Sequence, residues 1–178
     1  MGEIREEMKE VNRVYKNEKE MYPDVCSWFR KMLQSKFKDA TICVEDTSKK
    51  VLSKWLLEKG FHSYFPDYQT YEVEVDVTGV VVKSNKEAHL GFVECKLGKI
   101  NLRDFSQLLG YSKVALPFYS IILSPKGISQ SLNLLFNIAR RNDILYYSED
   151  KHIFITTWFI RKKEIDFSTI IPKGARII

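Results

Sequence analysis

Two stretches decide the fold: Tyr71-Glu-Val-Glu-Val-Asp-Val-Thr-Gly-Val-Val-Val82 and Leu90-Gly-Phe-Val-Glu-Cys-Lys-Leu97. The first alternates apolar and polar residues and then becomes continuously apolar, which is typical of a strand that enters a buried sheet. The second is also strand-like, and the polar residues 84–87 before it predict a turn. Together the two stretches predict a β-hairpin at the centre of the fold.

Acidic side chains occupy this hairpin on a face that should be buried. Because side chains alternate across a strand, Asp76 shares a face with Glu74, and Glu94 shares one with Lys96. A suitable register would bring Asp76 opposite the second pair. An unpaired buried carboxylate is costly, so we expect a cation to meet these groups. Asp76 and Glu94 with water and phosphate would form the hard oxygen site that Mg²⁺ or Mn²⁺ prefers, whereas Glu74 is interpreted as a neighbour at the solvent edge.

Periodic segments on both sides of the hairpin predict a mixed α/β protein. The expected helices cover 23–36, 51–60, 102–115 and 128–140, and the further strands cover 41–46, 119–123, 144–147 and 152–160. Pro23 suits a first helical turn, Gly60 a helix end, and Asn101 a helix cap. This order predicts a three-layer α/β/α sandwich with a mixed central sheet.

The chain has 178 residues, the size of an ordinary domain. Residues 1–20 are rich in Glu and Lys and predict a charged helix or arm, followed by a single domain over 21–171 and a tail over 172–178. The three cysteines have no CxxC spacing, which argues against a disulfide framework or a cysteine metal centre. The charged N-terminus and the absence of a long apolar run predict a cytoplasmic protein without a membrane partner.

Charge and chemistry favour a polyanionic partner. Lys and Arg number 28 against 23 Asp and Glu, a net charge of +5, which fits nucleic acid without demonstrating it. Lys99 and Arg103 follow the hairpin and could contact a phosphate backbone, although a short charged run is more often a solvated surface. A divalent cation would acidify bound water and neutralise charge on a phosphodiester. Lys96 could hold or deprotonate that water or stabilise the transition state, and the residues leave these roles open.

Asp76 followed by Glu94-Cys-Lys96 resembles the Asp…(Asp/Glu)-x-Lys signature of the restriction-endonuclease-like nucleases, the PD-(D/E)xK superfamily. Gln107-Leu-Leu-Gly-Tyr111 resembles the Gln-x-x-x-Tyr element of its RecB-like branch, which lies on the helix after the lysine strand. Val75 stands where the family commonly has proline. The resemblance covers residues 20–125 as an ordered series of elements.

The resemblance implies a core of one helix, three strands, a second helix and a further strand. It also implies Mg²⁺-dependent hydrolysis of DNA, with Mn²⁺ as a substitute, and catalytic roles for Gln107 and Tyr111 beside the acidic pair and Lys96. Glu20, ahead of the 23–36 helix, resembles an upstream acidic residue that many members add to the metal site. Endonuclease, exonuclease and junction resolvase activities all remain open, as does homodimerisation.

The same residues are compatible with functions that involve no catalysis. Asp76, Glu94 and Lys96 could form a cross-strand salt-bridge network on a solvated sheet face, although Leu90, Phe92 and the valine run favour burial. A nucleic-acid-binding or scaffolding protein on the same fold, with weak or lost catalysis, is the main functional alternative. A protein-interaction module that uses the 1–20 arm is a third.

Overall fold

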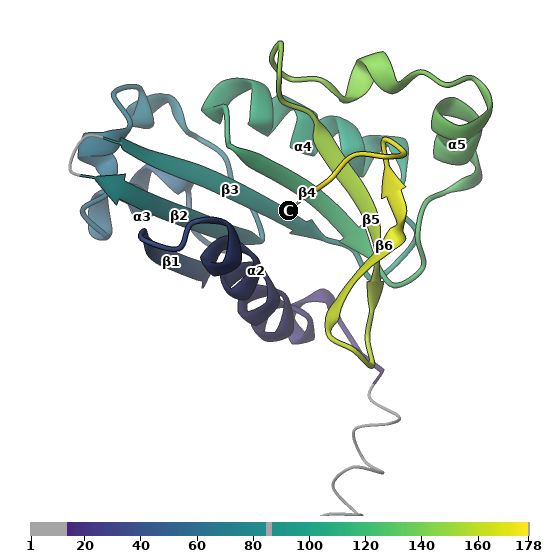
Figure 1. Ribbon diagram of the computed structural model, residues 1–178, viewed down its shortest axis with the longest axis horizontal. Helices are drawn as coiled ribbons and strands as arrows, with labels where there is room; N and C mark the ends of the chain where they lie inside the picture. The colour runs from purple at the N-terminus through teal and green to yellow at the C-terminus, as the bar shows by residue number, and fades with distance from the viewer. Residues whose placement is uncertain (1–13, 85–86, 178) are drawn as a thin grey trace, which may run out of the picture.

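The computed structural model describes residues 14–84 and 87–177 and contains a six-stranded mixed sheet with helices packed against it (Figure 1). In sheet order the strands are β1 (Thr41–Asp46), β2 (Val77–Ser84), β3 (Glu87–Cys95), β4 (Tyr119–Ser124), β5 (Ile153–Phe159) and β6 (Glu164–Ile171). The α-helices are α2 (Tyr22–Lys36), α3 (Leu52–Glu58), α4 (Leu102–Ala115) and α5 (Gln130–Asn133). Shorter 3-10 helices lie at Glu18–Glu20, His62–Tyr64, Tyr68–Thr70 and Asn142–Leu145, and a π-helical turn covers Leu134–Ile138.

The sheet changes from antiparallel to parallel pairing at its centre. Strands β1, β2 and β3 form an antiparallel meander, β3, β4 and β5 are parallel, and β6 returns antiparallel to β5. Parallel neighbours need a crossover, which α4 supplies between β3 and β4. In the β2–β3 hairpin Val77 pairs with Val93. The same register, extended by one residue, places Asp76 opposite Glu94, as the sequence predicts.

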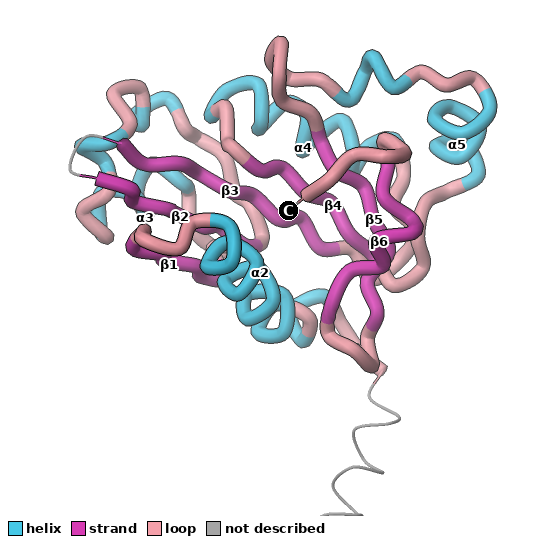
Figure 2. Tube along the Cα trace, viewed as in Figure 1, coloured by secondary structure: helices cyan, strands magenta, loops and turns pink. Residues whose placement is uncertain are grey.

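Helices cover both faces of the sheet, so the architecture is that of an α/β sandwich (Figure 2). The α2-side core joins α2 to one sheet face and includes Val25, Phe29, Leu33, Val77, Val81, Val93 and Cys95. The α4-side core joins α3 and α4 to the other face and includes Trp55, Phe105, Leu108, Val80, Phe92, Ile122 and Ile155. Alternation along β3 therefore places Phe92, Glu94 and Lys96 on the α4 side of the sheet.

Local sequence signals explain where the main helices begin and end. Pro23 lies in the first turn of α2, where its missing N–H has no intrahelical partner to lose. A capping box begins α4: Asn101 Oδ1 accepts hydrogen bonds from the backbone N–H groups of Arg103 and Asp104, and Asp104 Oδ2 accepts one from Asn101 N at 3.0 Å. Beyond α3, Gly60 has φ +76°, a conformation that favours glycine.

Residues 71–76 differ from the expected strand, because β2 begins only at Val77. The backbone of this segment pairs instead with the residues around the start of α3: Leu52 N donates to Val73 O at 2.9 Å, and Thr47 N donates to Asp76 O at 2.9 Å. Val73 is buried while Glu72 is exposed. Buried and exposed residues therefore do alternate in this segment, although it pairs with a loop and the start of a helix rather than with a strand.

The second half of the chain departs further from expectation. The predicted strand 144–147 is a 3-10 helix over Asn142–Leu145 and a single bridge between Tyr146 and His152. Its apolar character reflects burial without pairing, since Tyr147 is 7% exposed and its hydroxyl donates to Pro117 O at 2.8 Å. The predicted helix 128–140 is α5 followed directly by the π-helical turn.

Strand β6 has no counterpart in the sequence prediction. Its buried residues are Ile165, Ile170 and Ile171, and a register shift against β5 separates the first from the other two. That irregularity destroys the period of two by which a strand is recognised.

Both ends of the described chain contribute to the core. Tyr15 and Ile177 are each 2% exposed and belong to the α2-side core, although the sequence assigns them to an arm and a tail. Residues 1–13 of the predicted arm lie outside the described residues. Within the described part of the chain, no helix has both the length and the apolar character needed to cross a membrane.

Candidate metal centre

Asp76 lies immediately before β2, and two donors fix its carboxylate. Tyr22, the first residue of α2, donates its hydroxyl to Asp76 Oδ1 at 2.8 Å. Cys95 N, at the end of β3, donates to Asp76 Oδ2 at 2.8 Å. The backbone is held as well, because Asp76 O accepts the hydrogen bond from Thr47 N. Helix, hairpin and loop thus meet at one carboxylate and limit its orientation.

A buried pair of threonine hydroxyls also holds the backbone next to Asp76. Thr47 Oγ1 donates to Val75 O at 2.7 Å and lies 2.7 Å from Thr78 Oγ1. Thr47 is 1% exposed and Thr78 is fully buried. Because buried hydroxyls need partners, this pair fixes the chain on both sides of Asp76.

Glu94 and Lys96 lie beside Asp76 at the end of β3. Lys96 Nζ donates to Glu94 Oε1 at 2.9 Å. Glu94 is 6% exposed, and its second oxygen, Oε2, is buried without a hydrogen-bond partner among the described residues. A buried carboxylate oxygen without a partner is rare in folded proteins, and a water molecule or an ion can satisfy it.

The electrostatics of the cluster follow from burial and from the proximity of like charges. Burial raises the pKa of Glu94 to about 7, with the charge of Asp76 acting in the same direction and Lys96 against both. Burial likewise raises the pKa of Asp76, against the hydrogen bonds from Cys95 N and Tyr22. For Lys96, burial acts to lower the pKa, but the carboxylates of Glu94 and Asp76 outweigh it and hold the pKa well above its usual value.

Glu18, rather than Glu20, reaches this cluster from the upstream segment. Glu18 Oε1 accepts a hydrogen bond from Leu97 N at 3.2 Å, just beyond Lys96. Its charge acts on the pKa values of Asp76 and Lys96. The carboxylate of Glu20 instead accepts a hydrogen bond from Lys16 N at 3.0 Å. The 3-10 helix Glu18–Glu20 therefore directs Glu18 to the site, whereas the sequence prediction named Glu20.

Gln107 and Tyr111 form a pair on α4, as their spacing predicts. Gln107 Nε2 donates to Tyr111 OH at 2.8 Å, and Tyr111 packs against the α4-side core while Gln107 is exposed. Within the described residues, neither forms a hydrogen bond to the Asp76–Glu94–Lys96 cluster. The pair does lie on the helix that covers the same sheet face as Glu94.

Lys99 and Arg103 lie between the cluster and the body of α4, and both are exposed. Arg103 is in the first turn of α4, next to the Asn101 cap. Within the described residues, neither forms an ion pair. Exposed cations of this kind remain available to a phosphate.

Sequence reasoning missed three contributors: Tyr22, Glu18 and the backbone N–H of Cys95. Tyr22 carries no signal beyond its place at the start of a helix. Glu18 and Glu20 stand in the same charged run, and only the geometry of the 3-10 helix separates them. A backbone donor leaves no trace in a sequence.

The donor set fits a hard divalent cation held with help from a substrate. Among the described residues, no group of three or more His, Cys, Asp and Glu side chains is arranged to hold a metal ion by itself. Mg²⁺, however, is commonly bound through one or two carboxylates, with water and substrate phosphate completing its shell. Asp76 and Glu94, with the unpartnered Glu94 Oε2, meet that lower requirement.

Comparisons of the chain with protein-family models, with curated proteins and with solved structures found no match.

Proposed function

We propose that this protein is a metal-dependent nuclease with a restriction-endonuclease-like core, and that it hydrolyses DNA phosphodiester bonds. The observation that carries the proposal is the buried, unpartnered Glu94 Oε2 opposite Asp76 and two residues from Lys96. A salt-bridge network on a solvated face would not bury the carboxylate of Glu94. The order from α2 to β4 supports the same assignment: a helix, three antiparallel strands with α3 inserted between the first two, a second helix and a parallel strand.

Asp76 and Glu94 would hold Mg²⁺, which supplies charge neutralisation at the phosphate and acidifies bound water. Tyr22 and Cys95 N keep Asp76 oriented, because they occupy one lone pair on each of its oxygens. The hydrogen bond to Glu94 uses one of the three donors of the Lys96 ammonium. The remaining donors would orient the attacking water or contact the phosphoryl oxygens, where a positive charge stabilises the transition state.

Glu18 would complete the acidic side of the site, in place of the predicted Glu20. Gln107 and Tyr111 would approach the substrate from α4, and Lys99 and Arg103 would contact the backbone of the bound strand. Glu18 and Lys99 are given these roles because they lie next to the end of β3, and Arg103, Gln107 and Tyr111 because they lie on the helix that follows it.

Cleavage assays on purified protein with single-stranded, duplex and branched DNA in Mg²⁺ test the proposal. Asp76→Asn is the variant of choice, because its amide can donate to the Tyr22 oxygen while its carbonyl still accepts from Cys95 N. We expect Asp76→Asn and Lys96→Gln to reduce cleavage by about 100-fold or more. Glu74→Gln, an exposed change two residues from Asp76, is the matched control and should leave cleavage unchanged.

Undiminished cleavage by folded Asp76→Asn protein would contradict the proposal. DNA binding without cleavage of any substrate would favour the scaffolding alternative instead. A second pair of variants examines the upstream glutamate: Glu18→Gln should weaken Mn²⁺ binding severalfold, whereas Glu20→Gln should leave it unchanged. The reverse order would restore Glu20 as the ligand.

A further inference from the structure

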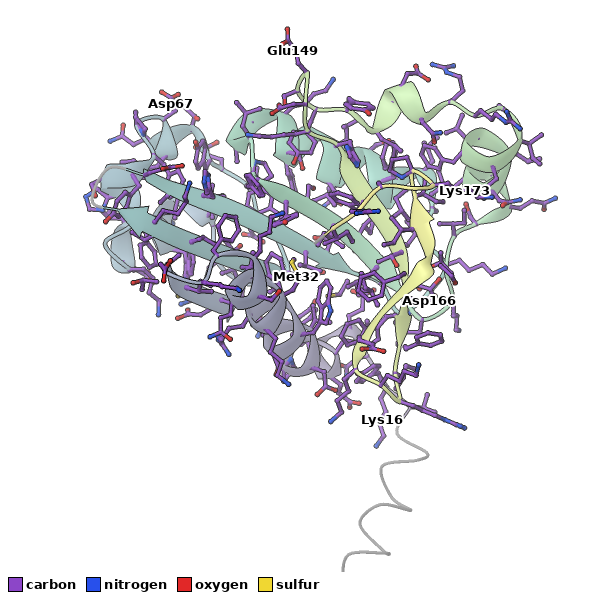
Figure 3. All side chains as sticks on the ribbon, in the orientation of Figure 1. Lys16, Met32, Asp67, Glu149, Asp166 and Lys173 are labelled. Carbon is purple, nitrogen blue, oxygen red and sulfur yellow. The ribbon has the colours of Figure 1, made fainter. Side chains whose placement is uncertain are left out.

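A cavity with a mixed polar and apolar lining lies on the α4 side of the sheet, between α5 and the edge strand β6. It has a volume of about 310 Å³ and lies next to a second cavity of about 250 Å³, with which it shares the lining residues Asn137, Ile171 and Lys173. Together they reach the size range of small-molecule sites. In Figure 3 the labelled Lys173 lies beside α5, just beyond the end of β6.

The irregular pairing of β5 with β6 creates this space. Ile155 pairs with Ile171, but the next paired residues are Thr157 and Asp166, so β6 places extra residues between the two pairs. Two of the extra residues, Ser168 and Thr169, line the cavity, and their hydroxyls donate to Asp166 Oδ1 and Asp166 O. Such bulges commonly occur next to functional sites.

The lining has the chemistry of a site for an anion with an apolar body. Lys173 and Arg140 contribute two positive charges to the lining, which contains no Asp or Glu. The acidic group that lies beside it is Asp166, whose Oδ1 accepts a hydrogen bond from the lining Ser168 hydroxyl at 2.6 Å. Within the described residues, neither cation has an acidic partner. Asn142 Oδ1, on the second cavity, is buried without a hydrogen-bond partner there.

Amides and isoleucines complete the surface. Asn137 Nδ2 donates to Asn133 Oδ1 at 2.8 Å, a bond that does not use the two N–H groups of the Asn133 side-chain amide. Ile155 and Ile171 provide an apolar floor. A nucleotide presents these same features in one molecule: a negative phosphate, polar edges and apolar ring faces.

The cavity adjoins the candidate metal centre through the central strands. Lys96 N donates to Leu123 O, and the next residue of β4, Ser124, pairs with Thr157 in the cavity wall. Lys96 and Thr157 are therefore two strand spacings apart, about 10 Å. A strand bound across Lys96 would pass the cavity within a short length of its backbone.

We infer that this cavity binds one unpaired nucleotide of the DNA strand that is cleaved. This inference rests on the proposed nuclease function. Lys173 and Arg140 contact the phosphate, and the base and sugar lie against Ile155 and Ile171. A base within a duplex can enter such a cavity only after it is unstacked and unpaired. The preferred substrate is thus single-stranded DNA, or a duplex end that has frayed.

The binding step is tested without catalysis, by titrating Asp76→Asn protein with thymidine monophosphate and recording heat or NMR shifts. Lys173→Gln/Arg140→Gln should weaken this binding by about tenfold or more, because two charge-assisted contacts are lost. Lys54→Gln/Arg161→Gln removes the same charge from exposed residues elsewhere and should change it less than twofold. Equal affinity in both double variants would overturn the inference.

The substrate preference is tested in protein with the wild-type metal centre. The Lys173/Arg140 double variant should lose about tenfold in kcat/KM on single-stranded DNA and keep its rate on covalently closed duplex DNA, which has no ends to fray. Equal losses on both substrates would also overturn the inference, while leaving the nuclease assignment intact. Nucleotide binding in the cavity without cleavage of any DNA would instead refute the nuclease and retain the cavity as a nucleotide site.

Discussion

At the scale of single residues, the Glu94 carboxylate combines burial, a neighbouring like charge and an oxygen without a hydrogen-bond partner among the described residues. Glu94 is 6% exposed and lies near the charge of Asp76. Its Oε1 accepts a hydrogen bond from Lys96, whereas its Oε2 has no hydrogen-bond partner in the described part of the chain. Burying charge in this way lowers stability, because the hydrogen bond from Lys96 does not replace all the water that the Glu94 carboxylate loses. Arrangements that weaken the fold while shifting a pKa are concentrated at functional sites. A bound cation would remove the conflict.

The first prediction is a pH dependence of stability in metal-free protein. The pKa of Glu94 is about 7 in the folded protein against an ordinary value of 4.5. Between these values the folded protein binds more protons than the unfolded chain, so the free energy of unfolding falls as pH rises. For Glu94 alone the fall is on the order of 1 kcal/mol per pH unit.

Urea unfolding from pH 4.5 to 8 in EDTA measures this effect. Glu94→Gln mimics the protonated form, so its stability relative to wild type should increase across the window and level off above pH 7. The exposed Glu74→Gln variant should follow the wild-type curve. Parallel curves for Glu94→Gln and wild type would show that Glu94 is charged throughout the range.

At the scale of secondary-structure elements, two glycines of the sheet allow α2 to pack closely against it. Gly79 and Gly91 are paired on β2 and β3, and both face the ring of Phe29. A Cβ built at Gly91 would lie 2.6 Å from Phe29 Cζ, and Phe29 is fully buried. The close approach brings the start of α2, and with it Tyr22, to Asp76.

Gly91→Ala should therefore lower the free energy of unfolding by about 1–3 kcal/mol, because the ring has no space into which to move. Gly110→Ala is the matched control: it lies in α4, and its added Cβ meets nothing within 4 Å. That variant should gain about 0.5–1 kcal/mol from better helix propensity. Urea unfolding followed by circular dichroism compares the two. Equal stabilities would show that α2 does not approach the sheet this closely.

Elements with a complete local signal were the ones that the sequence predicted well. The capped helix α4 begins at Leu102 and ends at Ala115 as expected, and the hairpin brings Asp76 to the end of β3, where Cys95 N donates to its carboxylate. Elements whose burial comes from distant partners were missed. Tyr147 is buried and donates its hydroxyl to Pro117 O without belonging to a strand, so its segment was mistaken for one. In β6 a register shift interrupts the alternation of buried and exposed residues. The same distinction separates the acidic strand residues, which were predicted, from Glu18, which only tertiary geometry selects.

At the scale of the whole molecule, the two ends of the described chain close the α2 side of the sandwich. Tyr15 accepts a hydrogen bond from Trp158 Nε1 at 3.3 Å and donates one to Asp24 Oδ2 at 2.9 Å. Ile177 is buried in the same core, far from Tyr15 in sequence. Segments that look like an arm and a tail thus complete the layer that carries Tyr22.

Ile177→Ala tests whether the final segment is structural. Removing a buried isoleucine side chain costs about 2–4 kcal/mol, through lost burial and the cavity that remains. Ile138→Ala deletes the same atoms at a position that is 68% exposed and should change stability by less than about 0.5 kcal/mol. Urea unfolding of both variants gives the comparison. Because α2 presents Tyr22 to Asp76 as long as the protein is folded, Ile177→Ala should weaken Mn²⁺ binding only near its unfolding transition. Weaker binding in the fully folded variant would instead couple the C-terminal segment directly to the metal centre.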